Sequence, residues 1–254
     1  MIRLVVGEGL SDARRALLGS LIDHAPTFPP ARLPTAAALA EDRRARAGAE
    51  AWLLGRLVWP SSRLAELAGY DPVPVSLVLD GALPGSGREL GRVEAVEARW
   101  PELPAFGGEV FVELPLDDAL EQNVERVKES GALAKVRCGG ERTPTSAELA
   151  RFVRACSHAG LPFKASAGLH RAVRTSEAHG FLNLLAAALS PERAEEALDE
   201  QDPAAFALEP SRFAWSGLEA DAAAIARMRR EGFRSFGSCS FAEPVGELRA
   251  LAIL

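Results

Sequence analysis

The stretch that decides the fold is residues 109–168, EVFVELPLDDALEQNVERVKESGALAKVRCGGERTPTSAELARFVRACSHAGLPFKASAG. It contains three short segments, at 109–114, 133–138 and 162–168, whose apolar and β-branched residues favour strands. The two segments between them carry apolar residues at helical spacing, and each ends at a glycine. Strands that alternate with helices are typical of parallel βα units, so we predict an α/β protein.

Segments of the same kind flank this stretch on both sides. A short first strand at 24–28 brings the number of predicted strands to eight, and the others lie at 52–59, 75–80, 93–99 and 233–241. Eight parallel strands and about 250 residues are typical of a (β/α)8 TIM barrel. We therefore predict a single barrel domain over residues 1–254, with a less regular segment over 1–50. Without the strand at 24–28, an open sheet is the alternative.

The connection before the last strand is longer than the others. We predict helices at 176–189, 191–200 and 218–231, which makes it an enlarged helical connection. At the other end of the chain, a helix is predicted from Ser11 to about Asp23, and Met1 to Val6 are predicted to form an extra strand or arm outside the barrel.

Composition excludes several classes of protein. Hydrophobic residues make up 48% of the chain and charged residues 25%, which excludes a disordered chain. The net charge of −6 provides no basic field for nucleic acid or an anionic membrane. The sequence has neither a signal peptide nor an apolar run long enough to span a bilayer, so we expect a cytoplasmic protein.

The three cysteines indicate reduced thiols. Cys138, Cys156 and Cys239 are an odd number, are widely spaced and form no CxxC motif. We therefore expect neither disulfides nor a metal site, and the sequence predicts no cofactor. A catalytic thiol is not expected either, because spacing ties no histidine to these cysteines.

Charged residues alternate with apolar ones along the central strands. Residues two apart on a strand share a face, so Lys135 and Arg137 lie together, and Glu113 and Lys164 hold matching positions on the neighbouring strands. Helices require the outer face of a parallel sheet to be apolar, which places these charges inside the barrel. We therefore expect Glu113, Lys135, Arg137 and Lys164 to face one pocket at the carboxyl ends of the strands.

Two neighbouring lysines in a barrel suggest amine chemistry. Close ammonium groups depress each other's pKa, and a neutral amine can attack a carbonyl to form a Schiff base while a carboxylate moves protons. A structural alternative is a layer of buried ion pairs that joins Glu113 with Lys135 or Lys164 and Glu97 with Arg137.

Four short motifs resemble the class I deoxyribose-phosphate aldolases, which are (β/α)8 barrels. Lys135-Val-Arg-Cys-Gly139 is similar to the sixth-strand motif of that family, which bears the Schiff-base lysine, and Lys164-Ala-Ser-Ala-Gly168 is similar to the seventh-strand motif. Phe236-Gly-Ser-Cys-Ser240 resembles the phosphate loop of the last strand. Phe111-Val-Glu113 resembles the fifth strand, which ends in a glutamate.

The resemblance implies roles for particular residues. It makes Lys135 the nucleophile and Lys164 the neighbour that lowers its pKa, and it places the strand-four acid on Glu94 or Glu97. Phosphate contacts would come from Gly168, Gly237 and Ser238. Arg137 stands where the aldolases have a small hydroxyl residue, which would narrow the pocket and add a fork suited to a carboxylate or phosphate.

The sequence leaves several functions open. The leading hypothesis is a lyase that forms a Schiff base with a small anionic carbonyl metabolite, with Ser166 and His170 as further substrate contacts. The first alternative is a barrel enzyme that binds phosphate or carboxylate without a covalent bond, as an isomerase or phosphoribosyl-type transferase. The second is a barrel without catalytic activity. The expected partner is a small anionic metabolite, with a second copy of the chain as a further candidate, and neither nucleic acid nor a membrane.

Overall fold

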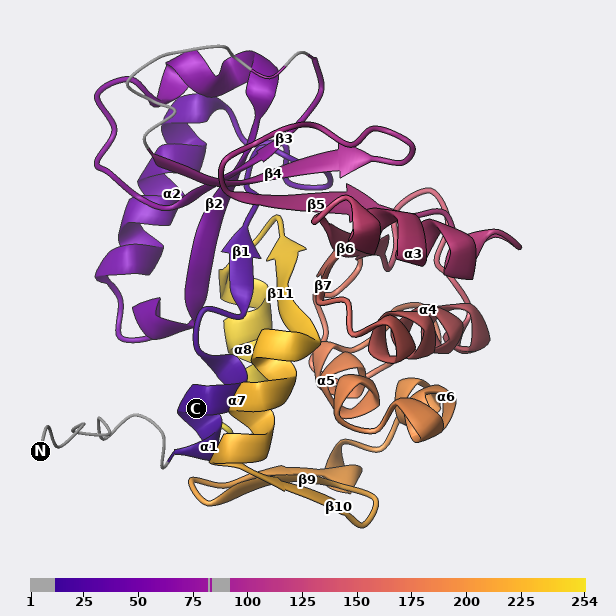
Figure 1. The fold of residues 1–254 in the computed structure, drawn as a ribbon. Helices are drawn as coiled ribbons and strands as arrows, with labels where there is room; N and C mark the ends of the chain where they lie inside the picture. Colours follow the sequence, from indigo (N-terminus) through magenta and orange to yellow (C-terminus); the bar gives the residue numbers. More distant parts are fainter. Residues whose placement is uncertain (1–11, 82, 84–91) are drawn as a thin grey trace, which may run out of the picture.

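The computed structural model describes residues 12–81, 83 and 92–254. Its centre is a closed barrel of eight parallel strands with helices between them, which confirms the predicted α/β class and the (β/α)8 TIM-barrel fold (Figure 1). Around the barrel the strands follow the order β1, β11, β7, β6, β5, β4, β3, β2. Their bounds are β1 (Ile22–His24), β2 (Leu54–Pro60), β3 (Val75–Val78), β4 (Val93–Arg99), β5 (Glu109–Glu113), β6 (Leu133–Arg137), β7 (Phe163–Ser166) and β11 (Phe233–Ser238).

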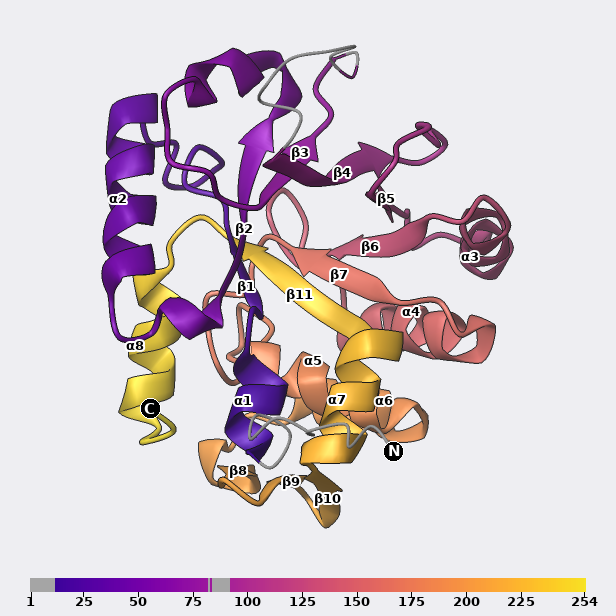
Figure 2. The same cartoon turned by 60° about the vertical axis from the view of Figure 1, so that its left-hand side comes forward.

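Helices cover the outside of the barrel, as a parallel sheet requires (Figure 2). They are α1 (Ala13–Leu18), α2 (Thr35–Ala47), α3 (Leu120–Glu129), α4 (Ser146–Ala159), α5 (Phe181–Leu189), α6 (Ala194–Asp199), α7 (Ala222–Glu231) and α8 (Ala242–Ala250). Short 3-10 helices occupy Ala51–Leu53, Ser61–Leu67, Pro191–Arg193 and Pro203–Ala205. The apolar core lies between these helices and the outward faces of the strands.

Helix α4 begins and ends where the sequence predicts. The Thr145 hydroxyl accepts a hydrogen bond from the Glu148 backbone N–H, and the Glu148 carboxylate accepts one from the Thr145 N–H at 2.8 Å. Gly160 ends the helix with φ 63°, in the left-handed region that glycine adopts readily. On the buried face, the Phe152 ring meets Phe163 of β7 edge-on, with 5.2 Å between ring centroids, which fixes α4 against the barrel.

The N-terminal part differs from the prediction. The helix predicted from Ser11 to about Asp23 ends at Leu18, and β1 starts at Ile22, two residues before the predicted strand at 24–28. All three residues of β1 are buried, and β1 pairs with both β2 and β11. Closure of the barrel therefore outweighs the local helical pattern. The predicted arm at Met1 to Val6 lies outside the described residues.

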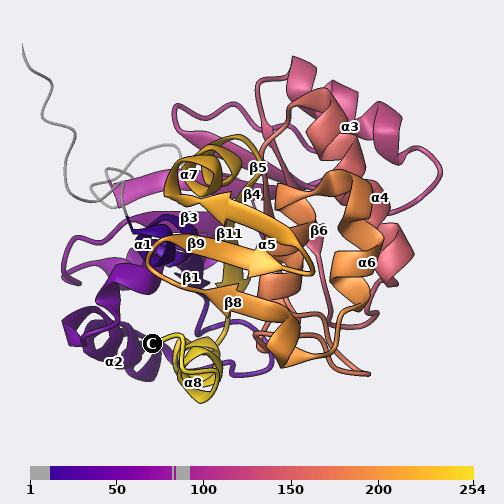
Figure 3. The same cartoon turned by 90° about the horizontal axis from the view of Figure 1, so that it is seen from below.

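Residues 206–221 contain a small antiparallel sheet that the sequence analysis missed. Its strands are β8 (Phe206–Leu208), β9 (Arg212–Trp215) and β10 (Leu218–Asp221). The sheet lies below α1 and α7, at the end of the barrel where the strands begin (Figure 3). Phe213 and Trp215 are buried, so the sheet adds apolar contacts at the end opposite the predicted pocket.

The enlarged helical connection is present, with α5 and α6 close to their predicted positions. The helix predicted over 218–231 is wrong in its first four residues, which form β10 instead. Leu218 pairs with Trp215 across a tight turn, so the chain reverses before α7 begins. The Asp221 carboxylate then caps α7 by accepting a hydrogen bond from the Ala224 N–H at 2.8 Å.

Candidate active site

A row of charged side chains crosses the interior of the barrel. In the strand register, Glu113 of β5 pairs with Lys135 of β6, and Lys135 pairs with Lys164 of β7. Side chains at matching register positions on neighbouring strands point to the same face. The alternation along the sequence therefore predicted correctly that these side chains share the inner face. The expectation that both lysines also line the pocket with Glu113 and Arg137 is wrong, because they are buried beneath it.

Glu97 of β4 joins the two lysines. Its Oε1 lies 2.6 Å from the Lys164 Nζ, and its Oε2 lies 2.9 Å from the Lys135 Nζ. The expected layer of ion pairs assigned Glu97 to Arg137, and the structure corrects this pairing. Each oxygen of the Glu97 carboxylate is thus paired with a different ammonium group, so the lysines are coupled through one acid.

Two further acids complete the row. At the inner end, Asp23 of β1 places its Oδ2 2.7 Å from the Lys164 Nζ. At the outer end, the Glu113 Oε2 lies 3.0 Å from the Lys135 Nζ, and the Glu113 Oε1 accepts a hydrogen bond from the Arg137 Nε at 3.1 Å. Three carboxylates thus alternate with three cations, which offsets the cost of burying so many charges.

Neutral hydrogen-bond donors hold the carboxylates in place. Ser76 of β3 donates its hydroxyl hydrogen to the Glu97 Oε1 at 2.8 Å. Ser235 of β11 donates to the Asp23 Oδ2 at 2.8 Å, and the Arg56 backbone N–H donates to the Asp23 Oδ1 at 2.9 Å. The orientation of each acid is therefore fixed by strands other than its own, which is the kind of support that a preorganised site needs.

The pairing keeps the buried groups charged. Burial favours the neutral form of Glu97, but Lys135 and Lys164 outweigh it and hold the Glu97 pKa well below its usual range. Burial likewise opposes the charged form of Lys164, yet Asp23 and Glu97 raise its pKa. The two lysines were expected to depress each other's pKa, and for Lys164 this is wrong, because the acids between and beside the lysines dominate.

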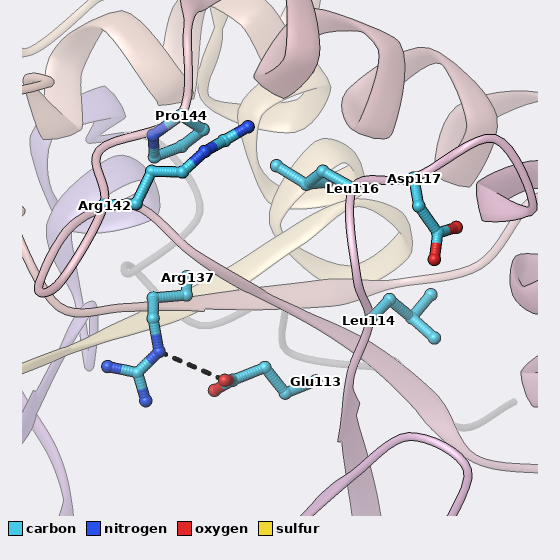
Figure 4. Close-up of a pocket in the computed structure, with 7 residues that line it drawn as sticks. All are labelled: Glu113, Leu114, Leu116, Asp117, Arg137, Arg142 and Pro144. Atoms are coloured by element: carbon cyan, nitrogen blue, oxygen red, sulfur yellow. Dashed lines mark hydrogen bonds and ion pairs between the residues drawn. The ribbon is translucent and has the colours of Figure 1, made fainter.

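The row leads from the core to the surface. Lys164 is fully buried, Lys135 is 5% exposed, and the side chains of Glu113 and Arg137 are 14% and 43% exposed. Beyond Glu113, a cavity of about 280 Å³ opens at the carboxyl ends of β5 and β6. Its lining residues are Glu113, Leu114, Leu116, Asp117, Arg137, Arg142 and Pro144 (Figure 4). This is the end of a TIM barrel at which active sites are found.

The two acids considered for strand four occupy different places. Glu97 contacts both lysines, whereas Glu94 lies where the strands begin and pairs with the Arg56 Nε at 3.2 Å. The two acids are three residues apart along β4, and a bulge lies at Glu94, because Val93 pairs with Val75 and Ala95 pairs with Ser76, which leaves Glu94 without a register partner on β3. Glu97 thus lies with the lysines, and Glu94 lines a second cavity, of about 370 Å³, at the opposite end of the barrel.

Three of the predicted substrate contacts border the mouth of the barrel. Ser166 ends β7 beside Arg137 of β6 and Gly237 of β11 in the strand register. Its hydroxyl is buried and has no hydrogen-bond partner among residues 12–81, 83 and 92–254. A Cβ added at Gly237 would meet no described atom within 4 Å, so there is open space beside it. An unpaired hydroxyl beside open space is suited to a polar ligand.

Two other predicted contacts have structural partners. Gly168 has φ +77°, and a Cβ there would lie 2.9 Å from the Cys138 carbonyl oxygen, so the loops after β6 and β7 pack backbone to backbone. Ser238 donates its hydroxyl hydrogen to the Ser240 carbonyl at 2.7 Å, which commits the side chain to its own turn. Any phosphate contact at Ser238 would therefore have to replace this bond.

His170 contacts an acid that the sequence analysis did not foresee. Its Nδ1 is 2.5 Å from the Glu243 Oε2, in the first turn of α8. His170 follows β7 and Glu243 follows β11, and these are neighbouring strands of the barrel, so spacing along the chain conceals the contact.

One compositional signal was also missed. The chain has only three lysines, Lys128, Lys135 and Lys164, among its 29 Lys and Arg residues. Arginine is thus the ordinary cation of this protein, yet two of the three lysines lie inside the barrel. Arginine stays protonated and suits buried ion pairs, whereas lysine can lose its proton and act as a nucleophile. The choice of lysine at these two positions favours a chemical role.

Comparison with protein-family models and with curated proteins finds no match for this chain. Within the described part of the chain, no helix is long and apolar enough to cross a bilayer. Nor do three or more His, Cys, Asp or Glu side chains gather as a metal-binding group in that part. The functional proposal below therefore rests on the fold and on the geometry of the site.

Proposed function

We propose that this protein is a lyase of the class I aldolase type, in which Lys135 forms a Schiff base with a small carbonyl compound that bears a carboxylate or phosphate. One observation carries the proposal: two of the chain's three lysines meet inside the barrel, joined by the Glu97 carboxylate, just below a cavity lined by Arg137. The three free cysteines fit the reducing conditions of a cytoplasm.

Lys135 is the better nucleophile of the two lysines. Lys164 is fully buried, and Asp23 and Glu97 raise its pKa, so it stays an ammonium group at neutral pH. Lys135 stands one strand nearer the cavity and is adjacent to Glu113, which lines that cavity. Lys164 is then a positioning residue that holds Glu97 against Lys135.

Substrate binding supplies the base that Lys135 needs. Burial raises the Glu113 pKa, but Lys135 and Arg137 together lower it below its usual range. An anionic group that binds the Arg137 guanidinium competes with Glu113 for that charge, which strengthens Glu113 as a proton acceptor. Glu113 then takes a proton from the Lys135 ammonium group, and the neutral amine becomes available only when substrate is present.

The remaining chemistry follows from the amine. The Lys135 nitrogen bonds to the carbonyl carbon of the substrate, and the carbonyl oxygen leaves as water after receiving protons. The resulting iminium group accepts the electron pair of the bond between the α and β carbons when that bond breaks, while the hydroxyl group on the β carbon loses its proton and departs as an aldehyde or ketone. The enamine that remains takes up a proton, and water then hydrolyses the iminium group, which releases the second product and frees Lys135. Glu97 and Glu113 lie on either side of the nitrogen and are the groups placed to move these protons.

The cavity favours a small substrate. Its volume of about 280 Å³ is just below the range of about 300–1,000 Å³ for ligand pockets. Arg137 gives Glu113 one hydrogen bond, through Nε, which leaves the two terminal nitrogens of the guanidinium for an anionic group. Arg142 lines the same cavity but pairs with Glu148, so Arg137 is the better anchor.

A second function is supported by the complete pairing of the lysines. In this alternative, Lys135 and Arg137 bind a carboxylate or phosphate without a covalent bond, as in an isomerase or phosphoribosyl-type transferase. Both ammonium groups already contact two carboxylates each, and ion pairs of this kind bind anionic groups without a covalent bond. The two functions share the cavity and differ in whether an adduct forms.

Reduction with borohydride separates the two functions. The protein is incubated with a panel of aldehydes and ketones that come in matched pairs, one with a phosphate or carboxylate and one without. The lyase is supported if reduction labels the protein faster with the anionic member of a pair and Lys135→Met removes the label. Thermal stabilisation by phosphate without any adduct would support non-covalent binding instead. If the protein forms no adduct and phosphate does not stabilise it, both functions are contradicted.

A further inference from the structure

The second cavity lies at the end of the barrel where the strands begin, opposite the site described above. Its volume of about 370 Å³ falls within the range of about 300–1,000 Å³ for ligand pockets. Arginines from four elements of the fold line it: Arg46 of α2, Arg56 of β2, Arg229 of α7 and Arg234 of β11. Guanidinium groups that converge on one cavity are suited to an anionic ligand.

Arg56 and Arg234 share one acid. Glu109 of β5 places its Oε2 2.6 Å from the Arg56 Nη2 and its Oε1 2.7 Å from the Arg234 Nη2, so the two guanidinium groups flank a single carboxylate. Arg56 also contacts Glu94 through Nε, and the Arg234 Nη1 donates to a backbone carbonyl. Among the described residues, the Arg56 Nη1 and the Arg234 Nε have no hydrogen-bond acceptor. Both side chains therefore keep N–H groups that can donate to a ligand.

Arg229 has no acidic partner in the described part of the chain. Its Nε donates to the Phe233 carbonyl at 3.0 Å, and its terminal nitrogens donate to other backbone carbonyls. These bonds orient the guanidinium group but leave its charge without a counterion. Burial lowers the pKa of Arg229 to about 10, although the nearby charge of Asp23 opposes this effect. An anion in the cavity would supply the missing counterion.

The charges around the cavity do not balance. Asp23 belongs to the row of the barrel interior, in which carboxylates and cations are equal in number, and Arg46 pairs with Asp42 at 2.7 Å. The remaining charged residues of the lining are three cations and two acids: Arg56, Arg229, Arg234, Glu94 and Glu109. Among the described residues, one positive charge is therefore uncompensated. A ligand with a single negative charge would neutralise it, and partly buried charges need such pairing.

We propose that the second cavity binds a small carboxylate, whose oxygens accept hydrogen bonds from the Arg56 and Arg234 guanidinium groups while Arg229 contributes its charge. A carboxylate carries one negative charge, which matches the single uncompensated cation. A phosphate monoester carries nearly two at neutral pH, so it would leave an excess negative charge beside Glu109. The planar carboxylate also fits the fork of an arginine side chain.

The rest of the lining agrees with a small ligand. Leu54 and Pro74 provide an apolar wall that a short carbon chain can contact. Glu94, which competes for Arg56, has a side chain that is 53% exposed, so it can turn toward solvent at little cost when a ligand binds.

This site is separate from the proposed active site. The two cavities have no lining residue in common, and Arg137 lines only the first. The proposal therefore stands even if Lys135 forms no Schiff base. Both cavities can hold a carboxylate, so the experiment has to tell them apart.

Melting temperatures in sodium acetate and sodium lactate, compared with sodium chloride at the same ionic strength, test the proposal. We expect both carboxylates to raise the melting temperature more than chloride does. In Arg234→Met, the apparent Kd for acetate should rise at least about tenfold, because a hydrogen bond to a charged group contributes at least about that factor. Arg137→Met is the matched variant at the first cavity, and it should keep the stabilisation by acetate.

Glu94→Gln should change the affinity in the opposite direction. It removes the competing charge beside Arg56, so the Kd for acetate should fall by about fivefold, as expected for one unit charge at about 4 Å in water. A gain in affinity cannot result from partial unfolding. The proposal is overturned if acetate and lactate stabilise the wild type no more than chloride does, or if folded Arg234→Met keeps the wild-type Kd. It is also overturned if phosphate stabilises Arg137→Met protein more than acetate does.

Discussion

Lys135 and Lys164 are register partners on neighbouring strands, and their ammonium groups share the Glu97 carboxylate. This relationship makes the interior of the barrel one electrostatic unit, because neither lysine can change its charge without affecting the other through Glu97. It also defines different positions for the two lysines. Lys164 is enclosed by acids in the core, and Lys135 lies between the core and the cavity.

Replacement of either lysine tests this difference. In Lys135→Met, Glu97 keeps Lys164 and Glu113 keeps Arg137, so we expect a loss of about 1.5–3 kcal/mol in the free energy of unfolding. In Lys164→Met, the buried Asp23 loses the cation that its carboxylate contacts directly, and we expect a loss of about 3–5 kcal/mol. Denaturant unfolding measures both values. Equal losses would contradict the positions assigned to the lysines.

Removal of the shared acid should also be costly. Glu97→Gln leaves the interior with one uncompensated positive charge, and we expect a loss of about 3–5 kcal/mol in the free energy of unfolding. Glu94→Gln is the matched control on the same strand, because that side chain is 53% exposed, and it should cost less than about 1 kcal/mol. Comparable values for the two variants in urea unfolding would be evidence against the buried row.

Stability should fall in acid. The pKa of Glu97 and of Glu113 is lowered in the folded protein, so both carboxylates contribute stability above their unfolded pKa, near 4.5. That contribution is lost as the pH falls from about 4.5 toward the folded values. Melting temperatures between pH 7 and pH 3 should drop steeply below about 4.5 in the wild type and less steeply in Glu97→Gln. A flat profile in the wild type would disagree with the lowered pKa values.

Arg137 should determine affinity for anions. Arg137→Met removes the guanidinium that faces the cavity. Hydrogen bonds to charged groups contribute about 1.5–3 kcal/mol, so we expect the Kd of this variant for inorganic phosphate to be at least about tenfold higher. The shift in melting temperature with phosphate at constant ionic strength measures the effect. Arg230→Met, in the last turn of α7 with a side chain that is 63% exposed, is the control, because it does not line the cavity. Equal phosphate shifts in both variants would rule out Arg137 as the anchor.

Much of the row could be predicted from the sequence. The alternation of apolar and charged residues in residues 109–168 placed Glu113, Lys135 and Lys164 on one face, because the side-chain period of a strand is two. The capping residues Thr145 and Glu148 fixed the start of α4 in the same way. Both patterns involve residues that are close in sequence. Such patterns predict the structure correctly where the residues they place on the inner or buried face are in fact buried.

The contacts across the barrel could not be predicted. Asp23 reaches Lys164 only because β1 starts earlier than its local pattern indicates, and Glu97 meets both lysines because strands that are not neighbours face each other across the closed barrel. The contact between His170 and Glu243 likewise joins segments that follow two neighbouring strands. Each contact is set by closure of the barrel, which no short segment of the chain specifies.

The most direct test of the central claim is the position of the reduced carbonyl adduct. Because the chain has only Lys128, Lys135 and Lys164, peptide mass analysis after borohydride reduction assigns the modified side chain without ambiguity. We predict an adduct on Lys135 that persists in Lys128→Met and disappears in Lys135→Met. An adduct confined to the exposed Lys128 or to the amino terminus, or one that forms on Lys164 with Lys135 unmodified, would contradict the account.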